Sequence, residues 1–271
     1  MVKVEAKGYG QMYIDGFLQH AYDVARKVIR NDWDMVFIID GSEGSGKSVL
    51  AMQSAKYCDE DFNLDRVVFT PKEFRKAIIE SQKYQAVVYD EAYTGLSSRA
   101  TMSLINRTLI SMLAEIRQKN LFVFVVMPCF FDLDKYVALW RSRALIHVYT
   151  GKDFSRGFLA FYNTDRKKSL FMLGKKFYSY GKPTPNFIGR FTNKYVVDEK
   201  AYKKKKKDSL IAREKTREEK ELRDEIQAAL FERLQADDVK LKTVEKLKIL
   251  NMTATTYYRK LKQHEDDKLL T

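Results

Sequence analysis

Apolar residues in the first half of the chain follow two alternating patterns, short continuous runs and longer segments with helical spacing. The continuous runs predict buried strands at residues 35–40, 66–70, 86–90, 121–127 and 145–149. Segments with apolar positions three or four residues apart predict helices at residues 17–29, 47–57, 71–82, 103–118 and 132–140. Strands that alternate with helices at this spacing indicate an α/β fold whose mostly parallel sheet has helices on both faces.

Beyond Gly151 the pattern becomes strand, turn and strand, which predicts a hairpin of residues 157–162 and 169–173 at the edge of the sheet. A run of lysines from Lys203 to Lys207 follows, which we interpret as a solvated linker that can touch a DNA backbone. The sequence after it is rich in Ala, Leu, Glu and Lys with helical spacing.

These changes divide the chain into three parts. Residues 1–163 are predicted to form the α/β core with an N-terminal helix, residues 164–207 a basic and aromatic strap with the linker, and residues 208–271 a helical region.

The most specific motif is an eight-residue loop between the first predicted strand and the helix after it. It consists of Gly41, Ser42, Glu43, Gly44, Ser45, Gly46, Lys47 and Ser48, and it fits the Gly-x-x-x-x-Gly-Lys-[Ser/Thr] phosphate-binding pattern at every fixed position. In such a loop, backbone N–H groups and the positive end of the following helix hold the phosphates. We expect Lys47 to reach the β- and γ-phosphates and the Ser48 hydroxyl to bind Mg²⁺, so the sequence predicts ATP and Mg²⁺ as ligands.

A second motif, Asp90-Glu91, ends the predicted strand at residues 86–90. Asp90 is expected to hold the Mg²⁺ shell through water, and Glu91 to polarise the water that attacks the γ-phosphate. One further predicted strand lies between the loop and this pair, so the strands that carry them can be separated in the sheet. The pair indicates hydrolysis, not binding alone.

At this point residues 33–150 resemble a family. The loop, the Asp90-Glu91 pair, the long helix that ends near Arg117 and the strand after it resemble the RecA-like ATPase core, with its additional catalytic glutamate, of FtsK/HerA-type DNA translocases. The segment from Arg117 to the strand at Leu145 is most similar to zonula occludens toxin-like and viral genome-packaging ATPases. The resemblance implies an arginine that reaches a neighbouring subunit's γ-phosphate, for which Arg117, Arg141 and Arg143 compete. One departure is that the fourth strand ends at Met127 without the polar sensor usual in such ATPases.

Charge indicates the class of partner. The chain of 271 residues has a net charge of +13, and residues 164–207 hold fourteen Lys and Arg against three acids. Such an excess favours a polyanion, and aromatic residues interleaved with the cations suit contact with DNA, although they equally suit covering the sheet. Two cysteines, Cys58 and Cys129, form no ligand cluster, the three histidines have no ligand spacing, and no apolar run is long enough to cross a membrane. We therefore expect a cytoplasmic protein without a membrane partner.

The last segment, residues 237–262, resembles a helix-turn-helix. Asn251 suits the left-handed residue of a turn between helices at residues 243–250 and 253–261. The predicted DNA contacts are Lys203, Lys204, Lys205, Thr255, Thr256, Tyr257, Arg259 and Lys260. A helical hairpin used for subunit contact is the alternative.

Together these features predict a Mg²⁺-dependent ATPase that acts on DNA, as an oligomeric, ring-forming translocase of viral or mobile-element type. A replicative helicase or helicase loader is one alternative. The other is a DNA-binding regulator in which ATP binding is the signal; Glu91 favours turnover, and the missing polar sensor favours the switch.

Overall fold

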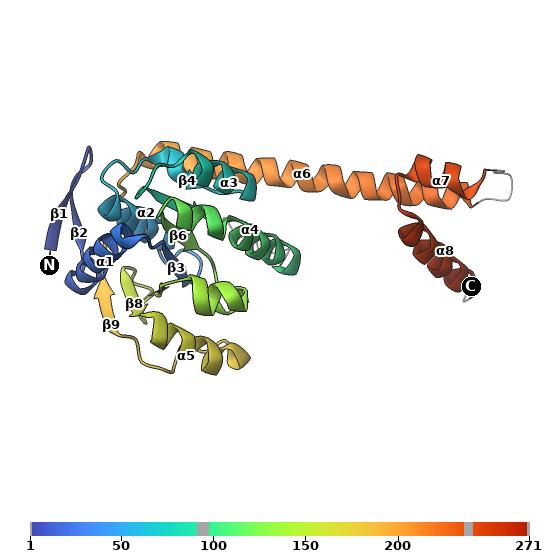
Figure 1. Cartoon of the computed structure of the whole chain (residues 1–271). Coiled ribbons are helices and arrows are strands. Elements are labelled where there is room, and N and C mark those ends of the chain that lie inside the picture. The colour runs from blue at the N-terminus through green and yellow to red at the C-terminus, as the bar shows by residue number, and fades with distance from the viewer. Residues whose placement is uncertain (1, 91–97, 236–240, 270–271) are drawn as a thin grey trace. The chain divides into compact units, whose positions relative to one another are not determined.

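A seven-stranded sheet forms the centre of the first part of the chain, residues 1–209, in the computed structural model, which describes residues 2–90, 98–235 and 241–269 (Figure 1). Its strands, in spatial order, are β4 (Val67–Val68), β5 (Ala86–Asp90), β6 (Phe122–Val126), β3 (Met35–Gly41), β7 (Ala144–Tyr149), β8 (Phe158–Tyr162) and β9 (Phe187–Arg190). The first five are parallel, and β8 and β9 continue the sheet antiparallel. This confirms the mostly parallel sheet predicted from sequence, with β6 inserted between β3 and β5.

Register places the functional ends of these strands at one edge of the sheet. Asp40 on β3 pairs with His147 on β7, and Asp90 on β5 pairs with Val126 on β6. Because parallel strands end at the same edge, the loop after β3 and the acid that ends β5 share this edge, which we call the carboxyl edge.

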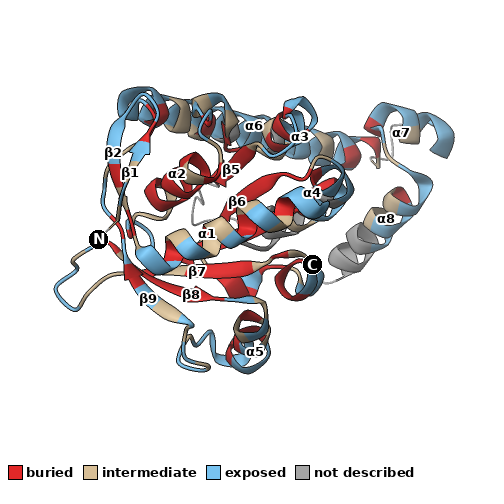
Figure 2. Cartoon of the chain, turned by 60° about the vertical axis from the view of Figure 1, so that its left-hand side comes forward, coloured by how far each residue is buried: buried red, intermediate tan, exposed pale blue. Residues whose placement is uncertain are grey.

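Two hydrophobic cores enclose the sheet, one on each face. Alternate residues of β3 point to opposite sides: Phe37 and Ile39 enter one core, and Val36 and Ile38 enter the other. The first core is covered by α1 (Gly16–Val28) and α2 (Lys47–Cys58), and the second by α3 (Pro71–Glu80), α4 (Ser98–Gln118), α5 (Thr164–Gly174) and the short turns η3 (Phe130–Asp132) and η4 (Val137–Arg141). Figure 2 shows β5, β6 and β7 mostly buried between these layers, whereas β9 at the edge of the sheet is largely intermediate or exposed.

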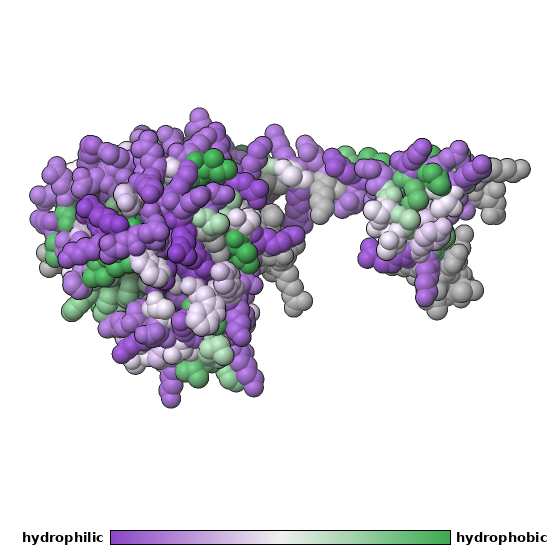
Figure 3. Space-filling view, in the orientation of Figure 1, coloured by the Kyte–Doolittle hydropathy of each residue, from purple (hydrophilic) through white to green (hydrophobic). Residues whose placement is uncertain are grey.

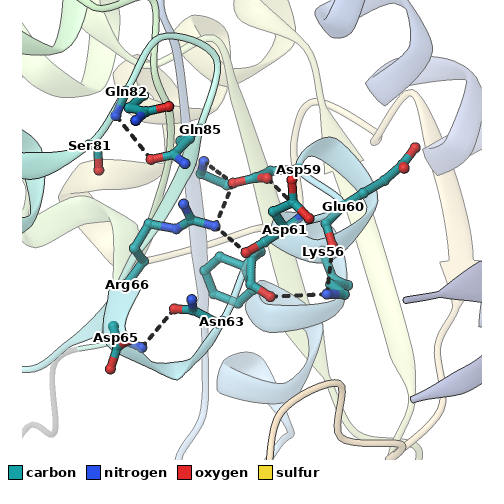
Figure 4. Close-up of polar contacts among 12 residues, drawn as sticks. Lys56, Asp59, Glu60, Asp61, Asn63, Asp65, Arg66, Ser81, Gln82 and Gln85 are labelled. Atoms are coloured by element: carbon teal, nitrogen blue, oxygen red, sulfur yellow. Dashed lines mark hydrogen bonds and ion pairs between the residues drawn. The ribbon is translucent and has the colours of Figure 1, made fainter. Parts of the chain in front are cut away.

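Polar contacts fix the segment that joins α2 to the edge of the sheet (Figure 4). Arg66 pairs with Asp59 at 2.9 Å and donates to the carbonyl of Asp61 at 2.6 Å. The same carboxylate oxygen of Asp59 accepts the backbone N–H of Ala86 at 2.9 Å. Since Ala86 begins β5, this network holds the end of α2 against the strand that carries Asp90.

Two segments differ from the predicted elements. A hairpin of β1 (Val2–Ala6) and β2 (Gly10–Ile14) precedes α1 and was not predicted. The prediction of a strand at residues 169–173 is wrong, because they lie in α5, where the Asn163 side chain caps the helix by accepting the N–H of Arg166 at 3.0 Å. The strand that pairs with β8 is β9 instead.

The chain divides into two compact units, Met1–Ser209 and Leu210–Thr271. The long helix α6 (Glu199–Leu234) begins in the first unit and ends in the second, and Lys203 to Lys207, predicted to be a solvated linker, are helical and lie just before the division between the units. The second unit also contains α7 (Thr243–Leu250) and α8 (Ala254–Leu269) and has a small core of its own, made by Phe231, Leu234, Leu250 and Tyr257.

Hydrophilic side chains cover most of the surface visible in Figure 3, and the apolar areas between them are small and separate. No helix in the described ranges combines the length and the apolar character needed to cross a membrane.

Candidate nucleotide site

The glycine-rich loop joins β3 to α2 at the carboxyl edge, and its shape requires its glycines. Gly41, Gly44 and Gly46 have φ angles of 137°, 73° and 102°, which side-chain-bearing residues rarely adopt. A β-carbon on Gly41 would lie 1.9 Å from the carbonyl oxygen of Val148, so any other residue would push β3 and β7 apart. The loop therefore brings its backbone close to the first turn of α2, as a phosphate-binding loop must.

Lys47 is the first residue of α2 and folds back over the loop. Its Nζ donates to the carbonyl oxygens of Gly41 at 2.6 Å and Ser42 at 2.7 Å. Burial lowers the pKa of Lys47, while the carboxylates of Asp40 and Asp90 act in the opposite direction. The ammonium of Lys47 therefore lies over the loop. The oxygens of a phosphate bound there would accept its hydrogen bonds in place of these carbonyl oxygens.

Ser48 and Asp90 meet at the place expected of a Mg²⁺ site. Ser48 Oγ donates to Asp90 Oδ1 at 3.0 Å, and the Asp90 side chain is almost fully buried at the end of β5. A hydroxyl and one carboxylate are few ligands, but Mg²⁺ normally keeps several waters and takes phosphate oxygens for the rest, so this donor set fits. The buried Ser45 Oγ has no hydrogen-bond partner among the described residues, which leaves a polar atom of the loop available to a ligand.

Two side chains of α6 also reach Asp90, and sequence reasoning missed both. The Tyr202 hydroxyl donates to Asp90 Oδ2 at 2.6 Å, and Lys206 Nζ lies 3.5 Å from the same oxygen. Burial, followed by the charge of Asp90, raises the pKa of Tyr202 well above its usual value, so its phenol stays a hydrogen-bond donor. A tyrosine and a lysine four residues apart in a lysine run were the only signal in the sequence.

Arg156 is a further cation at the loop that was not predicted. It lies in the segment between β7 and β8, and its Nη2 is 3.8 Å from where a β-carbon on Gly44 would stand. Its exposed guanidinium is therefore close enough to the loop to meet a bound phosphate.

A second polar cluster lies at the end of β3, directly next to the loop. The buried Asp40, which directly precedes Gly41, pairs with His147 Nδ1 at 2.9 Å and accepts the N–H of Phe130 at 2.9 Å. The Tyr180 hydroxyl donates to the same carboxylate, and its ring stacks on His147 with centroids 3.9 Å apart. The one clue in the sequence was a histidine near the carboxyl end of an apolar strand.

The three predicted arginines lie in two different places. Arg141 and Arg143 both pair with the buried Asp34, at 2.7 and 3.5 Å. Asp34 directly precedes β3 and Arg143 precedes β7, so this cluster lies at the edge of the sheet opposite the loop. Arg117 is exposed in the last turn of α4. Glu91 falls outside the described residues.

The predicted DNA contacts of the lysine run differ in exposure. Lys203 pairs with Glu199 at 2.5 Å on the exposed side of α6, and Lys204 is exposed. Lys205 is half-buried and donates to the carbonyl oxygens of Leu64 at 3.0 Å and Val67 at 2.7 Å, so it contributes to the fold of the first unit.

In the second unit, α7 and α8 flank a turn at Asn251, whose φ of 49° is left-handed as expected. Thr255 and Arg259 are exposed on α8, and Thr256 and Lys260 are partly buried. Tyr257 does not face the surface: it is 3% exposed, contacts Phe231 and accepts a hydrogen bond from Gln235 Nε2 at 3.0 Å. The expectation that Tyr257 contacts DNA is therefore wrong, and Tyr258 is the exposed tyrosine at this position of the helix.

Comparisons with known proteins identify no family. No family model matches the chain, and no curated protein matches it. One solved structure that resembles it is the N-terminal domain of zonular occludens toxin from Neisseria meningitidis, with 16% identity and a TM-score of 0.32 over 48% of this chain and 84% of that domain. A TM-score this low does not establish a shared fold, so functional interpretation depends on the loop and its contacts.

Proposed function

We propose that this protein is a RecA-like P-loop ATPase that binds and hydrolyses Mg²⁺·ATP. The observation that carries the proposal is the loop at residues 41–48, where left-handed glycines, Lys47 and the Ser48–Asp90 pair meet at the carboxyl edge of a parallel sheet. Backbone N–H groups of the loop and the end of α2 would hold the phosphates, and Lys47 would stabilise charge at the β- and γ-phosphates. Mg²⁺, held by Ser48 and Asp90, would supply positive charge to the phosphate oxygens.

Glu91 follows Asp90 directly in the chain and is the proposed base that orients the attacking water. Arg117 is the arginine we retain for action in trans, because its side chain is exposed, whereas Arg141 and Arg143 are held by a buried carboxylate of their own chain. A ring of subunits would bring Arg117 to a neighbour's nucleotide.

Direct measurement of nucleotide binding and turnover tests the site. Lys47→Ala should weaken binding of fluorescent ATP in Mg²⁺ by about tenfold or more, which corresponds to about 1.4 kcal/mol. Glu91→Gln should retain binding and lose turnover. Lys27→Ala removes the same charge from an exposed position on α1 and is the matched control. ATP binding and turnover that are the same in Lys47→Ala and Lys27→Ala would refute the assignment.

We propose further that the ATPase acts on DNA as an oligomeric translocase, of the kind that packages viral or mobile-element genomes. The support is the pair of helices α7 and α8, joined by a left-handed turn, together with exposed cations such as Lys204 and Arg259. Lys204→Gln and Arg259→Gln should each reduce the slope of log affinity against log salt by about one if each contacts a phosphate. Lys83→Gln, an exposed change before β5, should leave the slope unaltered.

The type of action on DNA is decided by one assay with defined substrates. A translocase should displace a triplex strand with ATP, a helicase should separate duplex strands, and an ATP-gated regulator should do neither while its DNA affinity changes with the nucleotide. Contact between α6 and Asp90 favours the regulator as the second candidate, because it links the nucleotide site to the helix that enters the C-terminal unit.

A further inference from the structure

The first two turns of α6 lie against the candidate metal site at Asp90. Tyr202 and Lys206 lie one helical turn apart, so both side chains project from the same face of α6. Tyr202 donates to Asp90 Oδ2 at 2.6 Å, and Lys206 Nζ lies 3.5 Å from that oxygen and 3.4 Å from the tyrosine hydroxyl. We call Tyr202 and Lys206 the α6 pair.

The α6 pair occupies the atoms that Mg²⁺ would need. Ser48 Oγ takes one oxygen of Asp90, and the α6 pair takes the other. A divalent cation bound here, directly or through water, would need these same oxygens. The ammonium of Lys206 already supplies, beside this buried carboxylate, a positive charge that a metal ion would have to replace.

The charge of Lys206 also acts on the loop lysine. Burial is the main cause that lowers the pKa of Lys47, and the positive charge of Lys206 acts in the same direction. Lys47 would turn to the phosphates of a bound nucleotide, but Lys206 and the metal ion would both remain at Asp90, and repulsion between these two cations disfavours their sharing of that carboxylate.

Other contacts hold the start of α6 on the first unit. The ring of Tyr202 lies between Phe69 and Tyr195, with centroids 6.0 and 5.8 Å away, and Lys205 donates to two carbonyls before and within β4. If the α6 pair released Asp90, the first turns of α6 would therefore change. The contacts of Lys205 with β4 would still hold the helix on the first unit.

We propose that the α6 pair competes with Mg²⁺ for Asp90, so that binding of Mg²⁺·nucleotide displaces Lys206 and the Tyr202 hydroxyl and loosens the start of α6. This rests on the proposed nucleotide site. Because α6 continues without a break into the C-terminal unit, the contact makes that helix responsive to the occupancy of the metal site.

The test is the Mg²⁺ dependence of nucleotide binding, measured with a fluorescent ATP analogue in a Mg²⁺ titration and in EDTA. Lys206→Met should lower the Mg²⁺ concentration at half-saturation by about threefold to tenfold, the range of a partly exposed ion pair. Tyr202→Phe should shift it in the same direction. Lys203→Met is the matched control, since Lys203 is on the same helix and pairs with Glu199 instead. Affinity in EDTA should not rise in any of them.

A second measurement follows the helix itself. Hydrogen exchange of residues 203–209 in the wild type should increase when Mg²⁺ and nucleotide are added together, and in Lys206→Met it should do so at lower Mg²⁺. Unchanged exchange at saturation, or equal Mg²⁺ midpoints in Lys206→Met and Lys203→Met, would overturn the proposal. So would weaker binding by Lys206→Met in both Mg²⁺ and EDTA, because that would make Lys206 a phosphate ligand.

Failure of the two proposals can be told apart. If the wild type binds nucleotide in a Mg²⁺-dependent manner and Lys47→Ala does not, the nucleotide site stands, whatever the α6 variants show. If neither the wild type nor Lys206→Met binds nucleotide at any Mg²⁺ concentration, the proposed function fails, and the competition fails with it.

Discussion

Lys167 predicts an unusual dependence of stability on pH, because the fold buries its ammonium completely. Its side chain in α5 donates to the carbonyl oxygen of Ala138 in the turn η4 and has no exposed surface. Desolvation, with smaller contributions from the charges of Lys168 and Arg143, lowers the pKa of Lys167 from 10.5 to about 7. Since a charged amine is costly to bury, the protein is less stable wherever Lys167 must be protonated.

The sign and size of the effect follow from these two pKa values. Below pH 7 Lys167 is protonated in both the folded and the unfolded states, so the free-energy cost of burying its charge does not change with pH. Between about 7 and 10.5 the unfolded chain binds more protons than the folded protein, so stability rises with pH. Each pH unit in this range changes the free energy of unfolding by about 1.4 kcal/mol. Raising the pH from 7 to 9 should therefore increase that free energy by about 2 to 3 kcal/mol.

Urea denaturation of the wild type and Lys167→Met at about pH 6 and pH 9 measures this increase. The variant should be the more stable protein at the lower pH, even after losing about 1 kcal/mol with the hydrogen bond to Ala138. Its advantage should then shrink by about 2 to 3 kcal/mol at the higher pH. In Lys176→Met, whose exposed amine lies 5.3 Å from the ring centre of Phe177, the difference from wild type should not vary with pH. An advantage of Lys167→Met that is constant or grows with pH would refute the reasoning.

Three other predictions concern different parts of the fold. Asp34→Asn should cost about 3 to 5 kcal/mol in urea denaturation, because it leaves two partly buried arginines without their carboxylate, and a loss below about 1 kcal/mol would contradict this. Gly41→Ala should abolish nucleotide binding, since its β-carbon would meet the Val148 carbonyl. Gly8→Ala, where φ is also positive at 84° but the space around the residue is open, should bind normally. Tyr257→Phe should lower thermal stability by about 1 kcal/mol and leave DNA affinity unchanged, and a selective loss of DNA affinity would restore its predicted role.

Sequence predicted the parts of this protein that local pattern controls. Apolar runs alternating with helical spacing gave the order of β3 to β7 and the helices between them, because a strand buried on both faces must be continuously apolar. Left-handed glycines and a lysine at fixed spacing gave the loop, since few other residues can form that turn. The separation of β3 from β5 was only allowed by the sequence: β6, which follows both in the chain, lies between them, and the intervening strand β4 lies at the edge of the sheet.

Contacts between distant segments could not be predicted in this way. Asp40, His147 and Tyr180 meet only because β3 and β7 are neighbours in the sheet and the segment after α5 returns to their ends. Helical spacing placed Tyr257 on α8 but did not say which face the core would cover. The residues 169–173 are apolar enough for a strand, yet the cap at Asn163 and the burial of only one face made them a helix.

The charge of the basic strap also has to be interpreted differently once its contacts are known. Several cations among residues 164–207 bind within the chain, and these are Arg166, Lys167, Lys194, Lys203, Lys205 and Lys206. Most of these donate to backbone carbonyls, so they hold the segment on the sheet and are not free to neutralise phosphates. If DNA binds this segment, its affinity should therefore depend on salt much less steeply than the slope of about 13 that fourteen free cations would give. A slope near that value would require the strap to leave the sheet when DNA binds, and hydrogen exchange of β9 with and without DNA would detect that departure.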